Sequence, residues 1–193
     1  MSIARLLHRF ACVLSLRERQ GVAAIEFALY SVVFLSILAG TVDIGNLIFS
    51  EFQLDQSIAA GAQYAVVNAT QVSSSGGGAL ASSISTVVNN GHTSSGGWTN
   101  TVVVNNGPTA TTTNGTVSSS GTAANADNYY CPTGTPGSWT WGAGKTSGAS
   151  CGSNVIAGKF VTISASRSIA PFFPAWGFVT NGTITHYAMV QVQ

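Results

Sequence analysis

The feature that most constrains this chain is a long apolar run between residues 25 and 48. The run holds thirteen Ile, Leu, Val or Phe residues and two carboxylates, Glu26 and Asp43. On the membrane-insertion scale the apolar residues contribute about −4 to −8 kcal/mol, against about +3 kcal/mol for one central carboxylate. The carboxylates are separated by a helical rise of about 26 Å, so each lies near one face of a hydrocarbon layer about 30 Å thick. The sequence therefore predicts a transmembrane helix over 22–48.

Charge is scarce in this chain and is placed unevenly. Only 7% of the 193 residues are charged and the net charge is +1, so a phosphate-binding surface has no electrostatic basis and nucleic acid is not an expected partner. The arginines cluster before the apolar run, at Arg5, Arg9, Arg17 and Arg19. By the positive-inside rule the N-terminus then lies in the cytoplasm and the C-terminal bulk is exported.

Residues 1–21 are predicted to form a basic cytoplasmic leader. Apolar residues and arginines alternate there at near-helical spacing, which is typical of an amphipathic helix at a membrane surface. A secretory signal peptide is the competing interpretation, but the apolar patch is short and Arg-Glu-Arg-Gln follows it where a small-residue cleavage site is required. A later cut near Ala39, with Ile37 before it, fits the small-x-small pattern poorly.

The helix is predicted to continue beyond the membrane, over 49–70. Its apolar residues keep three- and four-residue spacing, at Leu54, Ile58, Ala62, Ala65 and Val66. One face of this segment therefore needs cover, and the small residues from Ala59 to Ala62 allow another element to approach closely. The remaining residues, 71–193, form the exported domain.

The sequence of the exported domain predicts an α+β fold. We expect a linker over 73–78, a short helix through 80–88 that ends at Asn90-Gly91 (a strand is the alternative), and a strand over 98–104 with a turn at 106–108. The polar tract 109–128 is expected to be a long loop or a weak edge strand, and a Gly-rich loop follows over 132–152. A strand over 159–167, an apolar loop over 169–176 and a hairpin at Asn181-Gly182, which pairs 178–180 with 183–185, complete an antiparallel sheet that packs on the outer half of the long helix.

The cysteine count favours one disulfide. Cys12 lies in the leader, while Cys131 and Cys151 lie in the exported domain, so removal of the leader leaves an even number. Closing that loop of about twenty residues stabilises the fold by about 3 kcal/mol in the chain-entropy model. Two free buried thiols are the alternative.

The chain carries no motif of an enzyme, and neither a metal nor a cofactor is expected. Serine is abundant and His92, His186 and Asp127 are present, but no nucleophile elbow, His-x-x-x-His pair or carboxylate cluster accompanies them. The histidines and cysteines also lack the spacing of metal ligands. The tryptophans form either a sugar-stacking surface or, as we favour, anchors of the core and loops; they are Trp98, Trp139, Trp141 and Trp176.

Glu26 is the strongest candidate for a functional residue. A carboxylate near the start of a hydrophobic helix costs several kcal/mol unless it is paired. Cleavage after Gly21 would create an ammonium group on Val22, four positions before Glu26, and the carboxylate of one subunit could then pair with the terminal ammonium of its neighbour. The alternative is an interfacial glutamate with no specific role.

This boundary resembles the processing site of type IV pilins. Gly21, Glu26 as the fifth residue of a mature chain, and Phe27 are similar to the Gly-x-x-x-x-Glu-Tyr pattern of Flp pilins in the tight-adherence system. The stretch Gly21-Val-Ala-Ala-Ile-Glu-Phe-Ala-Leu, the segments Asp43-Ile-Gly-Asn and Ser57-Ile-Ala-Ala-Gly-Ala-Gln-Tyr-Ala, and the loose pattern of the last third are similar to TadE-like minor pilins. Phe27 departs from the tyrosine of the major Flp pilins, and the chain is far longer than theirs.

The resemblance implies a minor pilin or pseudopilin that acts in assembly, initiation or tipping of Tad/Flp-type fimbriae. The implied partners are a prepilin peptidase that cuts after Gly21, other pilin subunits, the Tad assembly platform and inner-membrane lipid. The implied location is the bacterial inner membrane, with the C-terminal domain in the periplasm or in an extracellular pilus. The alternatives are an uncleaved single-pass protein with a binding or adhesion domain, and an adhesin at the pilus tip.

Overall fold

The structure is a computed structural model that describes residues 3–91, 97–152, 154–171 and 182–193, with side chains described from residue 21 onward. The chain divides into two compact units, Met1–Gly45 and Asn46–Gln193. The first unit is helical. The second contains the rest of the same helix together with an antiparallel sheet, so the predicted α+β class is confirmed.

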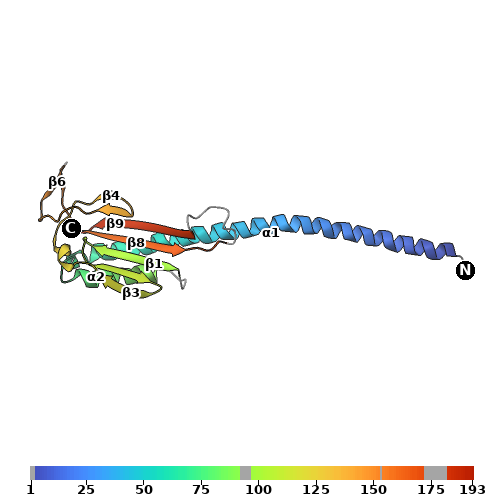
Figure 1. Ribbon diagram of the computed structural model, residues 1–193, viewed down its shortest axis with the longest axis horizontal. Helices are drawn as coiled ribbons and strands as arrows, with labels where there is room; N and C mark the ends of the chain where they lie inside the picture. The colour runs from blue at the N-terminus through green and yellow to red at the C-terminus, as the bar shows by residue number, and fades with distance from the viewer. Residues whose placement is uncertain (1–2, 92–96, 153, 172–181) are drawn as a thin grey trace. The chain divides into compact units, whose positions relative to one another are not determined.

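The described residues contain two α-helices, nine strands and two 3₁₀ turns. Figure 1 labels most of the helices and strands. The helices are α1 (Ile3–Val67) and α2 (Gly77–Asn90), and the turns are η1 (Ala69–Gln71) and η2 (Ala123–Asp127). The strands are β1 (Trp98–Val104), β2 (Thr109–Thr113), β3 (Thr116–Ser120), β4 (Thr133–Thr135), β5 (Ser138–Thr140), β6 (Ser150–Gly152), β7 (Val155–Ile156), β8 (Phe160–Ser168) and β9 (Thr183–Gln191).

Five of these strands form one antiparallel sheet in the order β3-β2-β1-β8-β9. The pairing of β8 with β9 is regular over nine residues, from Phe160 opposite Gln191 to Ser168 opposite Thr183. Strands β4 and β5 form a small separate hairpin, as do β6 and β7. Among the described strands, β3 and β9 are therefore the two edges of the main sheet.

The core lies between one face of this sheet and the two helices. Residues on β1 and β8 alternate between buried and half-buried, as expected for a sheet covered on one face. Buried apolar side chains come from α1 (Leu54, Ile58, Ala65), from α2 (Leu80, Ile84, Val88) and from the strands (Val102, Val161, Ile163, Ala165). The prediction that the outer half of the long helix packs on the sheet is confirmed.

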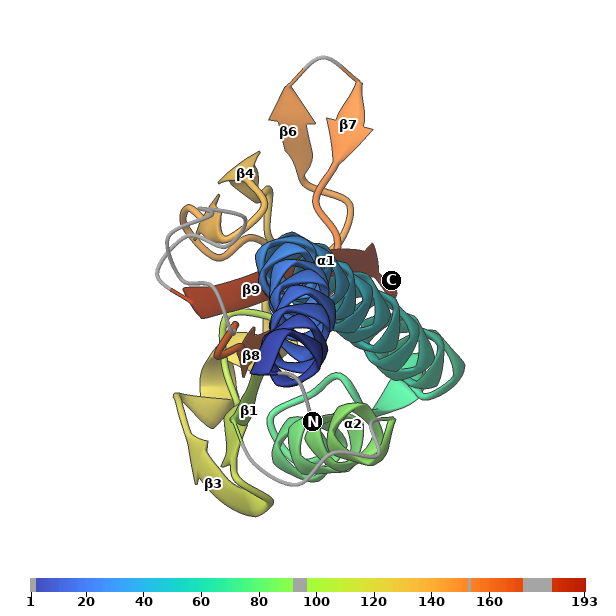
Figure 2. The same cartoon turned by 90° about the vertical axis from the view of Figure 1, so that its right-hand side faces the viewer.

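Helices α1 and α2 meet at Gly61, where they lie side by side (Figure 2). A Cβ atom on this glycine would lie 2.6 Å from Cγ2 of Val88 and 3.2 Å from Cδ1 of Ile163. The predicted close approach is present at Gly61, whereas Ala59 and Ala60 are exposed. The absence of a side chain at this one position lets α2 and β8 contact α1 together.

For the tract 109–128 the long loop is wrong, whereas the alternative of a weak edge strand is confirmed by β3, an exposed edge of the main sheet. Residues 109–120 form the hairpin β2–β3, and β2 lies inside the sheet because Ala110 and Thr112 are buried against the helices. The Thr112 hydroxyl lies 2.6 Å from the Ser85 hydroxyl on α2, which satisfies both groups in the core. The turn is Asn114-Gly115, with φ of 49° and 83°, as a type I′ turn requires.

The linker predicted for 73–78 is shorter than expected, because Gly77 and Gly78 belong to α2. Gly77 is buried, and a Cβ atom there would lie 3.0 Å from Cγ of Pro108. The helix predicted through 80–88 is confirmed and the strand alternative is wrong.

The predicted strands at 98–104 and 159–167 are confirmed within a residue by β1 and β8. In the predicted C-terminal hairpin, residues 178–180 and Asn181 lie outside the described residues. Residues 183–185 begin β9, which pairs with β8. Of the apolar loop at 169–176, Ile169 donates its backbone N–H to the Gly182 carbonyl at 2.7 Å, and residues 172–176 lie outside the described residues.

Candidate functional site

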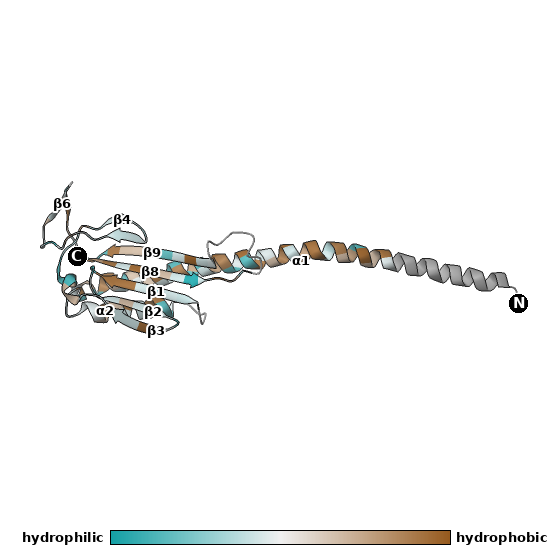
Figure 3. Cartoon of the chain, viewed as in Figure 1, coloured by the Kyte–Doolittle hydropathy of each residue, from teal (hydrophilic) through white to brown (hydrophobic). Residues whose placement is uncertain are grey.

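Residues 21–45 of α1 form an apolar helix whose side chains have little protein cover. The exposed fractions are 57% for Val22, 64% for Ile25 and 75% for Phe27, and most later apolar residues of the segment are similar. Figure 3 shows the hydrophobic colour along this stretch. Within Gly21–Val67, α1 is long and apolar enough to cross a membrane, as judged by length and composition.

The four predicted processing and docking residues, Gly21, Val22, Glu26 and Phe27, all lie on this helix and are exposed. A Cβ atom on Gly21 would have no other described atom within 4 Å. Val22 and Glu26 are one helical turn apart, so their side chains share a face. Among the described residues, Glu26 has no hydrogen-bond or ion-pair partner.

In the second unit, residues 46–67 of α1 have a buried face and an exposed face. The exposed face carries large apolar residues that are 50% to 82% exposed: Ile48, Phe49, Phe52, Val66 and Val67. Gln56, Ala59, Ala60 and Gln63 lie between them, and the exposed carboxylate of Asp55 borders this face. We call this surface the apolar stripe. A surface of this kind marks a contact with another apolar partner.

Polar contacts fix α1 on the sheet from the opposite side of the helix. Nη1 of Arg167, on β8, donates to Oγ of Ser50 at 2.7 Å and to Oε1 of Gln53 at 3.3 Å. The Arg167 guanidinium also lies 5.2 Å from the centre of the Trp98 ring. These contacts provide hydrogen-bond and aromatic partners for an arginine that lies at the end of a strand in a nearly uncharged domain. Sequence reasoning missed them, because Ser50 and Arg167 are 117 positions apart.

A second polar contact joins α1 to β9. Nδ1 of His186 lies 2.5 Å from Oδ1 of Asp55. His186 therefore lies beside a carboxylate of α1, whereas Asp127 accepts the backbone N–H of Ser74 at 2.8 Å. His92 lies outside the described residues. Within the residues that the structure describes, no group of three potential metal ligands occurs.

The contact between Asp127 and Ser74 changes the pKa of the Asp127 carboxyl group. Hydrogen bonds from the Ser74 hydroxyl and then from the Ser74 backbone N–H lower the pKa of Asp127, and the nearby charge of Lys159 adds to this effect. Lys159 itself is buried, and its Nζ donates to the Val72 carbonyl at 2.7 Å. These two contacts hold the segment between α1 and α2 on the rest of the domain.

Three of the four tryptophans, Trp98, Trp139 and Trp141, lie within the described residues. Trp98 is only 4% exposed and lies in the core. Trp141 contacts Tyr130 edge-on with 5.7 Å between ring centres, Trp139 is half-buried on β5, and Trp176 lies outside the described residues. For Trp98 and Trp141 this arrangement fits the favoured interpretation as core and loop anchors.

Cys131 and Cys151 form a disulfide, with 5.6 Å between their Cα atoms. The bridge closes the segment that carries the β4–β5 hairpin and leads into β6. No residue from Cys131 to Cys151 is buried. The covalent bond thus holds a region that packing holds weakly.

An apolar helix of this length that continues into an antiparallel α+β domain is typical of membrane-anchored proteins. A family model described as TadE-like protein matches residues 21–63. The match begins at Gly21 and covers 43 of the 193 residues, including the apolar helix and most of the apolar stripe, so the resemblance of this part of the chain to TadE-like proteins is confirmed. No curated protein matches the chain, and no solved structure does.

Proposed function

We propose that this chain is a minor pilin or pseudopilin that is cut after Gly21 by a prepilin peptidase and acts in assembly, initiation or tipping of a Tad/Flp-type fimbria. The observation that carries the proposal is the surface of α1. Residues 22–45 expose apolar side chains on all faces, and the apolar stripe exposes them on one face. The surface of residues 22–45 can contact lipid or other helices, whereas the apolar stripe can contact other helices.

The cut fits the local chemistry around Gly21. A peptidase binds its substrate in an extended form, so the helix must unwind there, and glycine lowers the cost by about 1 kcal/mol relative to alanine. Hydrolysis of the Gly21–Val22 peptide bond consumes one water and leaves a carboxylate on Gly21 and an ammonium on Val22. Arg17 and Arg19 leave with the leader, which removes cationic charge from the base of an apolar helix.

Glu26 is then the docking charge. The new ammonium on Val22 and the Glu26 carboxylate lie one turn apart on one face of the helix. In a bundle of such helices, the carboxylate of one subunit pairs with the ammonium of the next, which removes the cost of an unpaired charge in an apolar interior.

The apolar stripe would make binding of other pilin subunits to the outer part of α1 favourable. Full burial of one large apolar side chain contributes about 1.5 to 3 kcal/mol, so its five large residues together contribute several kcal/mol even when they are covered in part. The proposed partners are accordingly other pilin subunits, with the peptidase, the Tad assembly platform and inner-membrane lipid before assembly. The proposed topology has the leader in the cytoplasm and the C-terminal domain in the periplasm.

The second candidate is an uncleaved single-pass protein with a binding or adhesion domain. The second unit favours it in one respect, because Asn46–Gln193 closes its own core around both helices and the sheet. Such a domain can display a binding surface without assembly into a fibre.

The mature N-terminus separates the two candidates. We expect mass spectrometry of the membrane-extracted protein to find Val22 as the first residue. The variant Gly21→Val should stay uncut, whereas Gly45→Val, a second glycine of α1 with open surroundings, should be cut normally. An intact Met1 in the wild-type protein would contradict the pilin proposal.

A further inference from the structure

The free edge of β9 is an unprotected strand edge. β9 pairs with β8 over its whole length without a bulge, and no other described strand pairs with it. Proteins commonly protect such edges with charged residues, proline or a bulge. Thr183–Gln191 holds neither proline nor a lysine, arginine or carboxylate, and its histidine already pairs with Asp55. The edge therefore presents backbone N–H and C=O groups that can pair with another strand.

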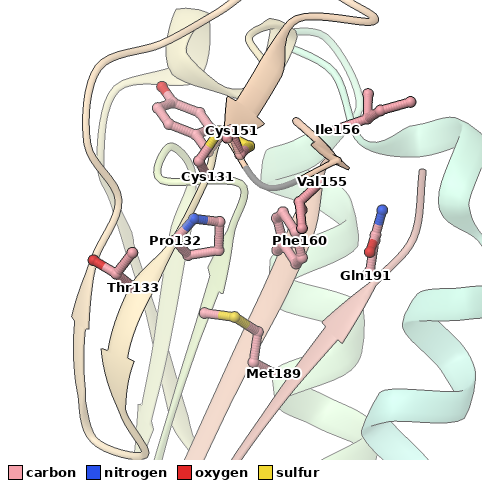
Figure 4. Close-up of a pocket in the computed structure, with 11 residues that line it drawn as sticks. Cys131, Pro132, Thr133, Cys151, Val155, Ile156, Phe160, Met189 and Gln191 are labelled. Atoms are coloured by element: carbon pink, nitrogen blue, oxygen red, sulfur yellow. A yellow bond between two sulfur atoms is a disulfide. The ribbon is translucent and has the colours of Figure 1, made fainter.

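Side chains of β9 alternate between the two faces of the sheet. Ala188 and Val190 pack toward the core and α1. Met189 and Gln191 point to the opposite face, toward the disulfide (Figure 4). A strand added to this edge would follow the same alternation, so its successive side chains would reach opposite faces.

A groove lies beside β9 on each of these faces. The helix-side groove, of about 390 Å³, is lined by Val190 and by Ala62, Gln63, Val66 and Val67 of α1. The disulfide-side groove, of about 460 Å³, is lined by Cys131, Cys151, Val155, Phe160, Met189 and Gln191, among others (Figure 4). None of the residues that line either groove is charged.

The residues that line each groove determine which side chains of a bound segment can occupy it. The helix-side groove is almost entirely aliphatic, so a polar side chain placed there would lose hydration without gaining a partner. The disulfide-side groove adds the Thr133 hydroxyl and the Gln191 amide, so it also accepts hydroxyl side chains. A charged residue would be unpaired in either groove.

We propose that the β9 edge around residues 187–191 binds an extended, uncharged segment of another protein, with aliphatic side chains at every second position and aliphatic or hydroxyl side chains between them. Main-chain hydrogen bonds provide affinity, and the two grooves provide specificity. The other edge of the main sheet in a second copy, β3, fits poorly, because it carries one aliphatic residue, Val117, among hydroxyl residues. The site does not include Gly21, Val22, Glu26 or Phe27 and does not depend on them, although its helix-side groove shares Val66 and Val67 with the apolar stripe.

The test uses the full chain in detergent micelles and a fluorescein-labelled peptide, Thr-Val-Thr-Val-Thr-Val-Thr. Fluorescence anisotropy should show saturable binding. A peptide of the same composition in blocks, Val-Val-Val-Thr-Thr-Thr-Thr, should bind at least about tenfold more weakly. N-methylation of the alternating peptide at every second residue along one edge should abolish binding for one of the two possible edges, because it removes the main-chain donors.

Two variants place a charge in the grooves without touching the core. Val67→Glu alters the helix-side groove and Gln191→Glu the disulfide-side groove, and both positions are exposed. Each should weaken binding about tenfold, whereas Val117→Glu, the same change at the opposite edge of the sheet, should leave it unchanged.

Three results would overturn the proposal. The first is the absence of saturable binding, and the second is equal binding of the block peptide. The third is self-association of the chain that Val67→Glu and Gln191→Glu abolish, since a second copy would then occupy the edge. Processing at Gly21 is measured independently, so failure of this proposal leaves the proposed function intact.

Discussion

Residues 22–45 and residues 46–67 belong to one α-helix but have different surroundings. In the first segment, aliphatic residues such as Leu35 are about 60% exposed, whereas in the second Leu54 is fully buried. Both segments have a high apolar content, so apolar content alone does not show which residues a sheet covers. The difference shows that the second segment has two apolar faces, of which one packs on its own domain and the other is exposed.

The largest effect is expected at the carboxylates of the two segments. Glu26→Ala should still be processed but should be at least tenfold depleted from sheared fibres, because the docking charge is lost. Glu51→Ala removes an exposed carboxylate from the second segment and should assemble normally. Immunoblots of sheared and membrane fractions measure both. Equal incorporation of the two variants would rule out docking through Glu26.

Next in size is the effect of removing matched leucines. Leu54→Ala should lower the free energy of unfolding of the exported domain by about 2 to 5 kcal/mol, because it leaves a cavity in the core. Leu35→Ala should leave that free energy unchanged, because Leu35 is 61% exposed in the other segment. Urea titration in detergent micelles, followed by tryptophan fluorescence, compares the two. Equal losses would show that the segments share one cooperative core.

Loss of the disulfide should follow in size. Cys131→Ser/Cys151→Ser should destabilise the exported domain by about 3 kcal/mol, because the unfolded chain regains the freedom of the closed loop. Urea titration of the variant and of oxidised wild-type protein gives the difference. Two alkylatable thiols in the exported wild-type protein would show that the bridge does not form in the cell.

The glycines of the two segments should respond with opposite signs. Gly61→Ala should destabilise the domain by about 1 to 3 kcal/mol, since its Cβ would lie 2.6 Å from Val88. Gly45→Ala meets open space and should raise local helix stability by up to about 1 kcal/mol. Circular dichroism during urea titration distinguishes them. Stabilisation by Gly61→Ala would show that α2 retreats from α1 without loss.

The smallest effect is expected at Asp127. Because the Ser74 hydrogen bonds lower the pKa of this carboxyl group, its contribution to stability is complete at neutral pH and is lost as acid protonates it in the folded state. Asp127→Asn should therefore be slightly less stable than wild type at pH about 7, and the difference should shrink below pH about 4. Urea midpoints across this range test the sign, and a difference that grows in acid would contradict it.

Much of the fold was predictable because its signals are local. The spacing of Leu80, Ile84 and Val88 and the Val-Thr-Ile-Ser strand each indicate their element within a few residues. The β2–β3 hairpin was missed although Asn114-Gly115 is a strong turn signal, because Thr and Ser on the flanking strands hide the apolar alternation. Thr112 is buried only because Ser85, from a helix elsewhere in the sequence, supplies a hydrogen bond.

The candidate site likewise has a part that local sequence predicts and a part that depends on distant contacts. Gly21, Glu26 and the apolar helix follow from residue order and charge, since the arginines, Gly21 and Glu26 lie within one short stretch. The contacts of Arg167 with Ser50 and of His186 with Asp55 join residues more than a hundred positions apart, and no local pattern encodes such pairs.

By itself, the sequence determined that an apolar helix follows an arginine-rich segment, that the carboxylate of Glu26 stands near the start of the apolar run, and that two of the three cysteines lie in the C-terminal part. Hydropathy, charge order and cysteine parity are properties of the chain and need no fold. The tertiary structure alone decided which face of residues 46–67 is covered, which strand edge stays free and where the two grooves lie. Those properties depend on which distant side chains meet, because packing at Gly61 and pairing of β8 with β9 leave the remaining surfaces open.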